Sequence, residues 1–283
     1  MKLNKQHAQI FVPDNSPVET ALARTTALCI TAHQDDIEIM AFGPIVECFA
    51  KDDKWFTGVV VTDGAGSPRS GVYEKFTDEE MKTVRAQEQK TAAGIGQYSA
   101  QVLMAYKSSE VKDPHNEELV KELAELIKQC KPTAIYTHNL ADKHDTHVAV
   151  ALRVISAVRS LPIEDRPQKV YSLEVWRGLD WLCDEDKSVF DTSAHTNLAA
   201  ALLGVHDSQI AGGKRYDLAT LGRRNANATF FASHDVDASD SVTYGLDITD
   251  LVNDETLSPA KFIIGFIDRF KDEITTRIER VAP

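Results

Sequence analysis

The sequence predicts an α/β protein built on a doubly wound, mostly parallel sheet. Apolar runs of strand length alternate with helical runs as far as residue 160, the pattern of parallel strands joined by crossover helices. Polar residues crowd the ends of two of these strands, where open α/β sheets bind their ligands. The chain of 283 residues is long enough for one large domain of this class.

The individual elements are predicted from apolar patterns and from the residues that end them. The expected strands cover residues 26–32, 55–61, 101–106, 133–137 and 170–176. The expected helices cover residues 39–50, 77–94, 116–130, 148–160, 196–205 and 259–281. A short helix is also predicted after Ser16, with Ser16 as its cap and Pro17 in its first position. Thr77 and Glu80 have the spacing of a capping box.

The domain organisation is inferred from the absence of any segment that would separate two domains. We find no linker, repeat or low-complexity tract, so a single domain over residues 1–283 is expected. Its sheet core is placed at about 22–176 and a C-terminal elaboration at about 177–283. The pattern loosens past Pro162, and residues 232–250 are acidic and irregular.

Composition and charge limit the classes of partner. Hydrophobic residues make up 43% and charged residues 26% of the chain, as in ordinary globular proteins. The net charge of −12 argues against nucleic acid or an anionic membrane as the main partner. No apolar stretch has the length of a membrane span or a signal peptide. The four cysteines form no CxxC pair, so a reduced, cytoplasmic location is expected.

The first polar cluster follows the strand predicted at 26–32. It contains His33, Asp35, Asp36 and Glu38, at the point where a strand ends and a helix begins. Asp35 or Asp36 could simply cap that helix, because a carboxylate there accepts from free backbone N–H groups. Capping explains neither His33 nor the second cluster.

The second cluster follows the strand predicted at 133–137 and includes Asp142, His144 and His147. Both clusters lie at carboxyl ends of parallel strands, so both are expected to face one crevice. His33, Asp36 and His147 would supply three protein ligands and leave room for water, as in catalytic zinc sites. The same ligands also suit Fe(II), and the sequence does not separate the two metals.

A metal held in this way activates water for attack on a carbonyl. A carboxylate beside the metal is then needed to take the proton of that water, and Asp35 is adjacent to the proposed ligand Asp36. A charged His144 could polarise the carbonyl and protonate the leaving amine. Asp142 or Asp145 could hold the tautomer of His144.

The two clusters resemble the motifs of a known family. Residues 32–38, Ala-His-Gln-Asp-Asp-Ile-Glu, are similar to the Ala-His-Pro-Asp-Asp-x-Glu motif of the PIG-L/LmbE-like metal-dependent deacetylases. Asp142-x-His144-x-x-His147 resembles the second motif of that family, Asp-x-His-Pro-Asp-His. Weaker similarities are Thr62-Asp63-Gly64, Arg85-x-x-Glu88 and His206-Asp207-Ser208-Gln209. The resemblance is good over about residues 26–160 and loose beyond.

The resemblance implies a Rossmann-like fold, zinc, and hydrolysis of an N-acetyl group, commonly on N-acetylglucosamine. Carried over by position, His33, Asp36 and His147 would bind the metal. Asp35 would be the general base, and His144 would stabilise the oxyanion and serve as acid.

Two basic residues are candidates for holding the substrate. Arg85 takes this role by its position in the family pattern, although Arg85 and Glu88 could instead pair on a helix surface. Arg69 lies in the loop at 62–71, whose glycines and serines suit close approach of a ligand.

The chain departs from the family pattern at two places. Gln34 stands where proline is usual, and Asp145-Thr146 replaces Pro-Asp. Neither change removes a proposed ligand, but both alter the residues that support the ligands.

Three functions are compatible with these residues. The first is a zinc-dependent de-N-acetylase that acts on a small N-acetylated amino sugar or its conjugate. The second is a metal-dependent phosphoesterase, in which the acidic cluster holds two metals. The third is a binding module for a sugar or nucleotide that has lost turnover.

The sequence does not identify the substrate. Residues that select it are expected in the 63–76 loop and in 176–240, where Arg223, Arg224 and His234 could line a pocket. A homo-oligomer is also possible, because the apolar face of the helix at 259–281 suits an interface as well as a core.

Overall fold

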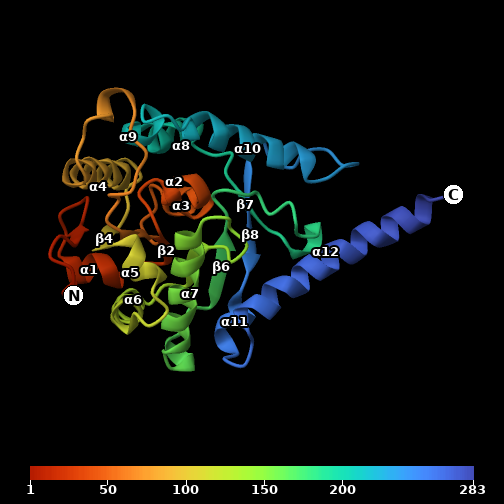
Figure 1. Cartoon of the computed structure of the whole chain (residues 1–283), viewed down its shortest axis with the longest axis horizontal. Coiled ribbons are helices and arrows are strands. Elements are labelled where there is room, and N and C mark those ends of the chain that lie inside the picture. The colour runs from red at the N-terminus through yellow and green to blue at the C-terminus, as the bar shows by residue number, and fades with distance from the viewer.

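The computed structural model describes all 283 residues and contains one eight-stranded sheet with helices on both faces (Figure 1). The strands are β1 (Gln9–Phe11), β2 (Ala27–Thr31), β3 (Phe56–Thr62), β4 (Ala100–Tyr106), β5 (Ala134–His138), β6 (Lys169–Leu173), β7 (Ser188–Asp191) and β8 (Val242–Asp247). Their spatial order is β1-β4-β3-β2-β5-β6-β8-β7. The central strands from β4 to β6 run parallel, and β1, β8 and β7 pair antiparallel at the two edges. The predicted doubly wound, mostly parallel sheet is confirmed.

Helices of 4 to 23 residues connect and cover the strands. The α-helices are α1 (Val18–Ala23), α2 (Asp36–Met40), α3 (Phe42–Cys48), α4 (Asp78–Ile95), α5 (Ser108–Lys112), α6 (Glu117–Cys130), α7 (Asp145–Arg159), α8 (Thr196–Gly204), α9 (Asp207–Ile210), α10 (Tyr216–Phe230), α11 (Thr249–Asn253) and α12 (Pro259–Val281). Single 3₁₀ turns are η1 (Gly71–Tyr73), η2 (Ile163–Asp165) and η3 (Asp184–Asp186). The capping box of Thr77 and Glu80 opens α4 as predicted.

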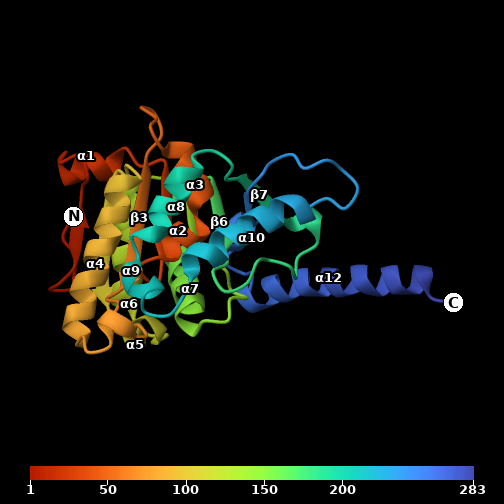
Figure 2. The same cartoon turned by 90° about the horizontal axis from the view of Figure 1, so that it is seen from above.

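Two hydrophobic layers hold these helices to the sheet. Alternate side chains of a strand point to opposite faces. Accordingly, Leu28 and Ile30 of β2 pack into a core with α1, α6, α7 and α11, whereas Cys29 packs with α2, α3, α4 and α8. Figure 1 shows the sheet between these two groups of helices, and Figure 2 looks onto the sheet through the group that contains α4 and α8. Because the central strands are covered on both faces, every residue of β2 and β3 is buried and their sequences are mostly apolar.

The order of the strands creates a switch point between β2 and β5. From β2 the chain adds β3 and β4 on one side, and then returns to place β5 on the other side of β2. Helices that follow strands on the two sides of such a point lie on opposite faces, which opens a crevice at the carboxyl ends of the strands. The loops after β2 and β5 carry the two polar clusters of the sequence.

Several elements differ from the sequence prediction. Residues 39–50 do not form one helix, because Pro44 has no N–H to donate to the carbonyl of Met40; α2 and α3 meet instead at Ala41. Ser16 does not cap α1, which begins at Val18 without a side-chain cap bond. The stretch 232–250 contains β8, which pairs with β7, and both strands lie outside the predicted 22–176 core, as does β1. The helix α10 was not predicted.

The helix α12 extends away from the rest of the molecule, as Figures 1 and 2 show. Only its first turns pack on the core, through Phe262, Ile263 and Phe266. Its exposed apolar side chains include Ile264, Ile274, Ile278 and Val281. None of the helices is both long enough and apolar enough to cross a membrane. The possible homo-oligomer stays a prediction.

A buried carboxylate organises the helices behind the first polar cluster. Glu38 of α2 is fully buried, and its carboxylate accepts hydrogen bonds from Gln89 Nε2 at 2.9 Å and Tyr98 OH at 2.8 Å. Its second oxygen lies 3.0 Å from His206 Nε2, and the pKa of His206 is raised: burial disfavours the charged ring, but Glu38 outweighs that effect. Three segments distant in sequence therefore meet on this one side chain.

We expect Glu38→Ala to destabilise the protein by about 3–5 kcal/mol, because the change leaves a buried histidine and two buried donors without their acceptor. The free energy of unfolding would be measured in urea. Glu47→Ala is the control: Glu47 is exposed on α3, so its loss should change stability by less than about 0.5 kcal/mol. A Glu38 variant as stable as this control would mean that the hydrogen bonds around Glu38 contribute nothing to the free energy of unfolding.

Candidate metal centre

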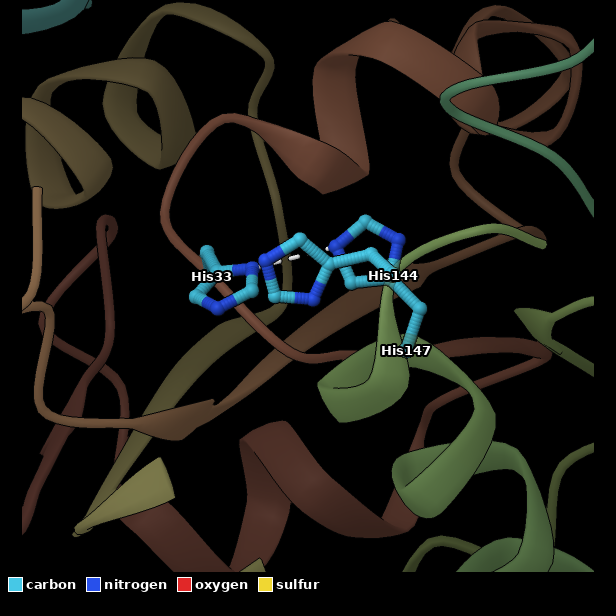
Figure 3. A group of neighbouring side chains, drawn as sticks. All are labelled: His33, His144 and His147. Atoms are coloured by element: carbon cyan, nitrogen blue, oxygen red, sulfur yellow. Dashed lines mark hydrogen bonds between the residues drawn. The ribbon is translucent and has the colours of Figure 1, made fainter. Parts of the chain in front are cut away.

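Two imidazole nitrogens and a carboxylate oxygen converge at the switch point. His33 Nδ1 lies 3.1 Å from His147 Nε2 and 3.2 Å from Asp36 Oδ2. His147 Nε2 lies 3.4 Å from the same oxygen of Asp36. Figure 3 shows His33 reaching this point from the loop after β2, and His144 and His147 reaching it from the start of α7. The sequence prediction that the two clusters share one crevice is thus met in the structure.

The first cluster is shaped by an unusual backbone conformation. Asp35 has a φ of 94°, which non-glycine residues rarely adopt. Its N–H donates to Gln89 Oε1 at 3.2 Å, and Arg85 donates to the neighbouring carbonyl of Gln34 at 2.6 Å. Asp35 does not cap α2 with its side chain. Such strain persists where surrounding contacts enforce it, and it is common at functional sites.

Asp36 is the next residue, and a backbone group of the same cluster holds its carboxylate. The backbone N–H of His33 donates to Asp36 Oδ2 at 2.7 Å. Burial alone would raise the pKa of Asp36, but His147 and His138 beside it hold that pKa well below its usual range. Asp36 is therefore an ionised carboxylate at ordinary pH, as a metal ligand must be.

The second cluster supports His147 from behind. His147 Nδ1 lies 3.3 Å from Asp142 Oδ2, so its proton faces that carboxylate and Nε2 faces the convergence point. Burial lowers the pKa of His147, but Asp36 and Asp142 outweigh it and the pKa is raised. The carboxylates of Asp36 and Asp142 therefore stabilise a positive charge at His147. A cation bound at the convergence point would also supply such a charge.

His144 is held differently from the sequence prediction. Asp142 accepts from the backbone N–H of His144 at 3.1 Å but does not bind its ring. His144 Nδ1 instead accepts from the backbone N–H of Thr146 at 3.2 Å, which places the ring proton on Nε2. Burial and the neighbouring His147 and His33 lower the pKa of His144, so its ring is neutral rather than charged.

His138 is a neighbour that the sequence analysis missed. It ends β5, is fully buried, and stacks on His147 with ring centroids 3.9 Å apart. Its Nε2 accepts the backbone N–H of Ala32 at 2.8 Å, so that nitrogen is already engaged. Burial lowers the pKa of His138 to about 4, which makes the ring neutral. A polar residue at the carboxyl end of a central strand was the signal that could have identified it.

These distances fit a metal ion. Atoms bound tetrahedrally at about 2.0–2.2 Å from one ion lie about 3.3–3.6 Å from one another. The three atoms of His33, Asp36 and His147 lie 3.1–3.4 Å apart. His144 lies beside them, with its ring centroid 5.0 Å from that of His33 and 4.6 Å from that of His147. Two neutral nitrogens and one carboxylate suit zinc or Fe(II).

Replacement of Asp142 by asparagine should weaken metal binding by about 10–100-fold, because an amide no longer attracts the Nδ1 proton of His147 as a carboxylate does. The dissociation constant would be measured by competition with a metal-binding dye. Asp145→Asn is the matched control, since exposed Asp145 contacts none of the three ligand atoms. If both variants bound the metal with equal affinity, this would contradict the role of Asp142 in supporting His147.

Asp35 and Arg85 lie together beside the cluster of His33, Asp36 and His147. Burial raises the pKa of Asp35 to about 7, although Arg85 Nη2, 3.8 Å from its carboxylate, opposes this rise. Arg85 and Glu88 do not pair on a helix surface. Both are buried, Arg85 against Asp35 and Gln34, and Glu88 against Ser208, whose N–H and hydroxyl donate to it at 2.7 and 2.6 Å.

A cavity of about 410 Å³ opens above the cluster. It is lined by His33, Asp35, Asp36, Ile39, Thr62, Gly64, Gly66, Ser67, Pro68, Arg85, Ser108, Lys112, His144, Thr146, His147, Val175, Trp176, Gln209, Lys214 and Tyr216. Four of these side chains come from residues 176–240, the stretch expected to select the substrate. The cavity is polar, so a hydrophilic ligand fits it best.

Other predicted pocket residues lie elsewhere. Arg69 does not line the cavity; its guanidinium holds Asp78 and the carbonyl of Ala65. Arg223 donates to the carbonyls of Val175 and Arg177. Arg224 is buried against the carbonyls of Glu38 and Ile39. His234 is exposed. These arginines support the loops and helices around the cavity instead of lining it.

Comparison with known families agrees with the resemblance in the motifs. Residues 28–158 match the family model "PIG-L: GlcNAc-PI de-N-acetylase". This range contains the converging residues His33, Asp36 and His147 and also Asp35, Arg85 and His144. A search of curated proteins found no match.

Several solved structures share the fold. The N,N'-diacetylchitobiose deacetylase from Pyrococcus horikoshii is 16% identical, with a TM-score of 0.64, over 82% of this chain and 86% of that one. The zinc-inhibited form of teicoplanin deacetylase Orf2 is also 16% identical, with a TM-score of 0.56, over 79% and 97%. GalB, the 4-carboxy-2-hydroxymuconate hydratase from Pseudomonas putida KT2440, is 17% identical, with a TM-score of 0.61, over 79% and 96%. At these identities the likeness shows the fold, and GalB performs a different reaction on it.

Proposed function

We propose that this chain, whose residues 28–158 match the PIG-L family model, is a zinc-dependent hydrolase that removes the acetyl group from a small N-acetylated amino sugar or its conjugate. The observation that carries the proposal is the convergence of His33 Nδ1, Asp36 Oδ2 and His147 Nε2 within 3.4 Å, with Asp35 and His144 beside them. Both the family match and the deacetylases among the structural neighbours support amide hydrolysis.

His33, Asp36 and His147 would hold the ion. Zinc bound there would lower the pKa of a water toward about 7 and polarise the amide carbonyl. Asp142 keeps the Nδ1 proton of His147 directed away from the ligand atoms, and His138 packs behind the ring. The two motifs thus supply both the ligands and the residues that orient them.

Asp35 is the base. It is buried, lies in the wall of the cavity and is adjacent in sequence to the ligand Asp36. Its carboxylate takes a proton from the attacking water, and Arg85 keeps that carboxylate in place from 3.8 Å. When the carbon–nitrogen bond breaks, the same carboxyl returns the proton to the leaving amine.

His144 binds the oxygen that becomes negative. Its Nδ1 accepts the N–H of Thr146, so the Nε2–H is free to donate into the cavity that it lines. The neutral ring carries one proton and cannot both stabilise the oxyanion and protonate the amine as a charged ring would. We therefore assign the hydrogen bond to His144 and the return of the proton to Asp35.

The pH dependence of the reaction should follow the ionisation of Asp35. Burial raises the pKa of Asp35 to about 7, so the base is ionised above that pH and becomes protonated below it. A bound cation favours the ionised form, so the midpoint should lie at or below about 7. We expect kcat/KM to decrease by about tenfold per pH unit below the midpoint. An activity that increased as the pH fell would contradict Asp35 as the base.

The proposed reaction is tested by elemental analysis of the purified protein together with acetate release from a panel of N-acetylated amino sugars. We expect about one zinc per chain and acetate release from at least one sugar. Release of phosphate from generic esters, with two metals per chain and no acetate, would instead show a phosphoesterase. Absence of zinc even after incubation with the ion would contradict the ligand set.

A further inference from the structure

Away from its floor, the cavity carries an excess of positive charge. Its only carboxylates are Asp35 and Asp36, which belong to the metal centre, whereas Arg85, Lys112 and Lys214 also line it. Arg85 already faces Asp35 at 3.8 Å. Lys112 and Lys214 are therefore the remaining lysine or arginine charges of the cavity, although the net charge of the chain is −12. A positive rim on an acidic protein favours ligands that carry negative charge.

Neither ammonium group is neutralised within the chain. Lys112 and Lys214 take part in none of the ion pairs or side-chain hydrogen bonds of the structure, whereas Lys82 and Lys187 each pair with carboxylates within 3.3 Å. Lys214 Nζ instead lies 5.4 Å from the centre of the Trp176 ring, another residue of the cavity wall. Both charges thus remain available to a ligand.

The backbone holds Lys214 at the rim. Gly213 has a φ of 111°, and a Cβ on Gly212 would lie 2.1 Å from the carbonyl oxygen of Ser208, so this turn needs both glycines. The N–H of Lys214 donates to the carbonyl of Gln209 at 3.0 Å. Beneath the turn, Ser208 is bound to the buried Glu88. Lys214 is therefore placed by a hydrogen-bonded turn and not by a loose loop.

Lys112 is fixed in a comparable way. It is the last residue of α5, and the buried Arg153 donates to the carbonyls of the residues on either side of it, Val111 at 3.2 Å and Asp113 at 2.8 Å. Two unrelated supports thus present two lysines to the same cavity. Trp176 and Tyr216 line the same cavity, with ring centroids 6.1 Å apart, and their apolar faces suit a sugar ring.

We propose that the substrate carries an anionic group, a carboxylate or a phosphate ester, on the part of the molecule that lies away from the acetamide, and that Lys112 and Lys214 bind this group. The inference rests on the proposed de-N-acetylation for the orientation of the substrate, with its acetamide at the metal centre. Two partly exposed ion pairs should together improve binding by about tenfold.

Three ligands test the inference: the carboxymethyl glycoside of N-acetylglucosamine, the uncharged carboxamide of that glycoside, and N-acetylglucosamine 1-phosphate. Dissociation constants for the zinc-loaded protein would be measured by calorimetry, and acetate release would be followed in parallel. The wild type should bind at least one anionic ligand about tenfold more tightly than the carboxamide. Whichever anionic ligand is preferred identifies the group as carboxylate or phosphate.

The Lys112→Met/Lys214→Met double variant should bind the charged and uncharged ligands equally. Lys143→Met is the control, because Lys143 is an exposed lysine near the second motif that does not line the cavity; this variant should keep the preference. No preference in the wild type, no binding of any ligand, or a preference that persists in the double variant would overturn the inference. A lysine-dependent preference without acetate release from any ligand would support the anion site and contradict the proposed reaction.

Discussion

Asp35→Asn should lower kcat by about 10²–10⁴-fold on the substrate identified by acetate release, while zinc stays bound. The amide cannot take a proton from water, but it has nearly the same shape as the carboxylate and leaves His33, Asp36 and His147 in place. Steady-state kinetics and elemental analysis on the same sample would separate the two effects. The unusual φ of 94° suits asparagine about as well as aspartate, so the fold should be kept.

Asp145→Asn is the control for this experiment, since Asp145 is exposed at the start of α7 and is adjacent to His144. Its kcat should be within about twofold of the wild-type value, because surface changes of this kind have small effects. A zinc-loaded Asp35→Asn protein with near wild-type kcat would show that the base is another group.

His147→Ala should remove both metal and activity. The imidazole would supply one of the three proposed ligand atoms and is itself held by Asp142, so the variant would keep only two of the proposed ligands. We expect zinc to fall from about one ion per chain to a small fraction of that after dialysis against metal-free buffer. Elemental analysis checks the metal, and acetate release checks the activity.

His115→Ala is the matched control because His115 is exposed and lies outside the cavity. Circular dichroism of both variants would show that the fold is kept. If His147→Ala retained one zinc per chain, the ion would have to be held by another set, such as one that includes His144 or His138.

The sheet was predictable because its central strands are buried on both faces. Ala27–Thr31 and Phe56–Thr62 are buried throughout and mostly apolar, and helical segments flank them, a pattern with few alternative arrangements. The edge strands were not predictable in this way. The three-residue β1 and the four-residue β7 are too short to have a pattern, and β8 follows an acidic run that obscures it.

The convergence of the two polar clusters was predictable because motif spacing and strand ends coincide. His33 and Asp36 are three residues apart after β2, and His144 and His147 are three apart after β5, so the parallel sheet brings the two pairs together. The assignment of metal ligands and catalytic roles stays a proposal, as do zinc as the metal, the cytoplasmic location and the single-domain organisation.

The supporting residues could not be predicted from local sequence. Arg85 and Glu88 have the spacing of a surface pair, yet α4 is buried there by the loop after β2 and by α9. Glu38 and His206 stand in segments that resemble family motifs, but nothing in the sequence pairs them across 168 positions, or pairs Glu38 with Gln89 across 51 positions. Their burial depends on how the helices pack, which periodicity within one helix does not specify.

The proposed metal-dependent deacetylation is tested most directly by titrating chelator-treated protein with zinc and measuring acetate release at each step. We expect no release from the stripped protein and a linear rise that ends at about one zinc per chain. Full acetate release from stripped protein, or none at any zinc content from the substrates of the panel, would contradict the proposed function.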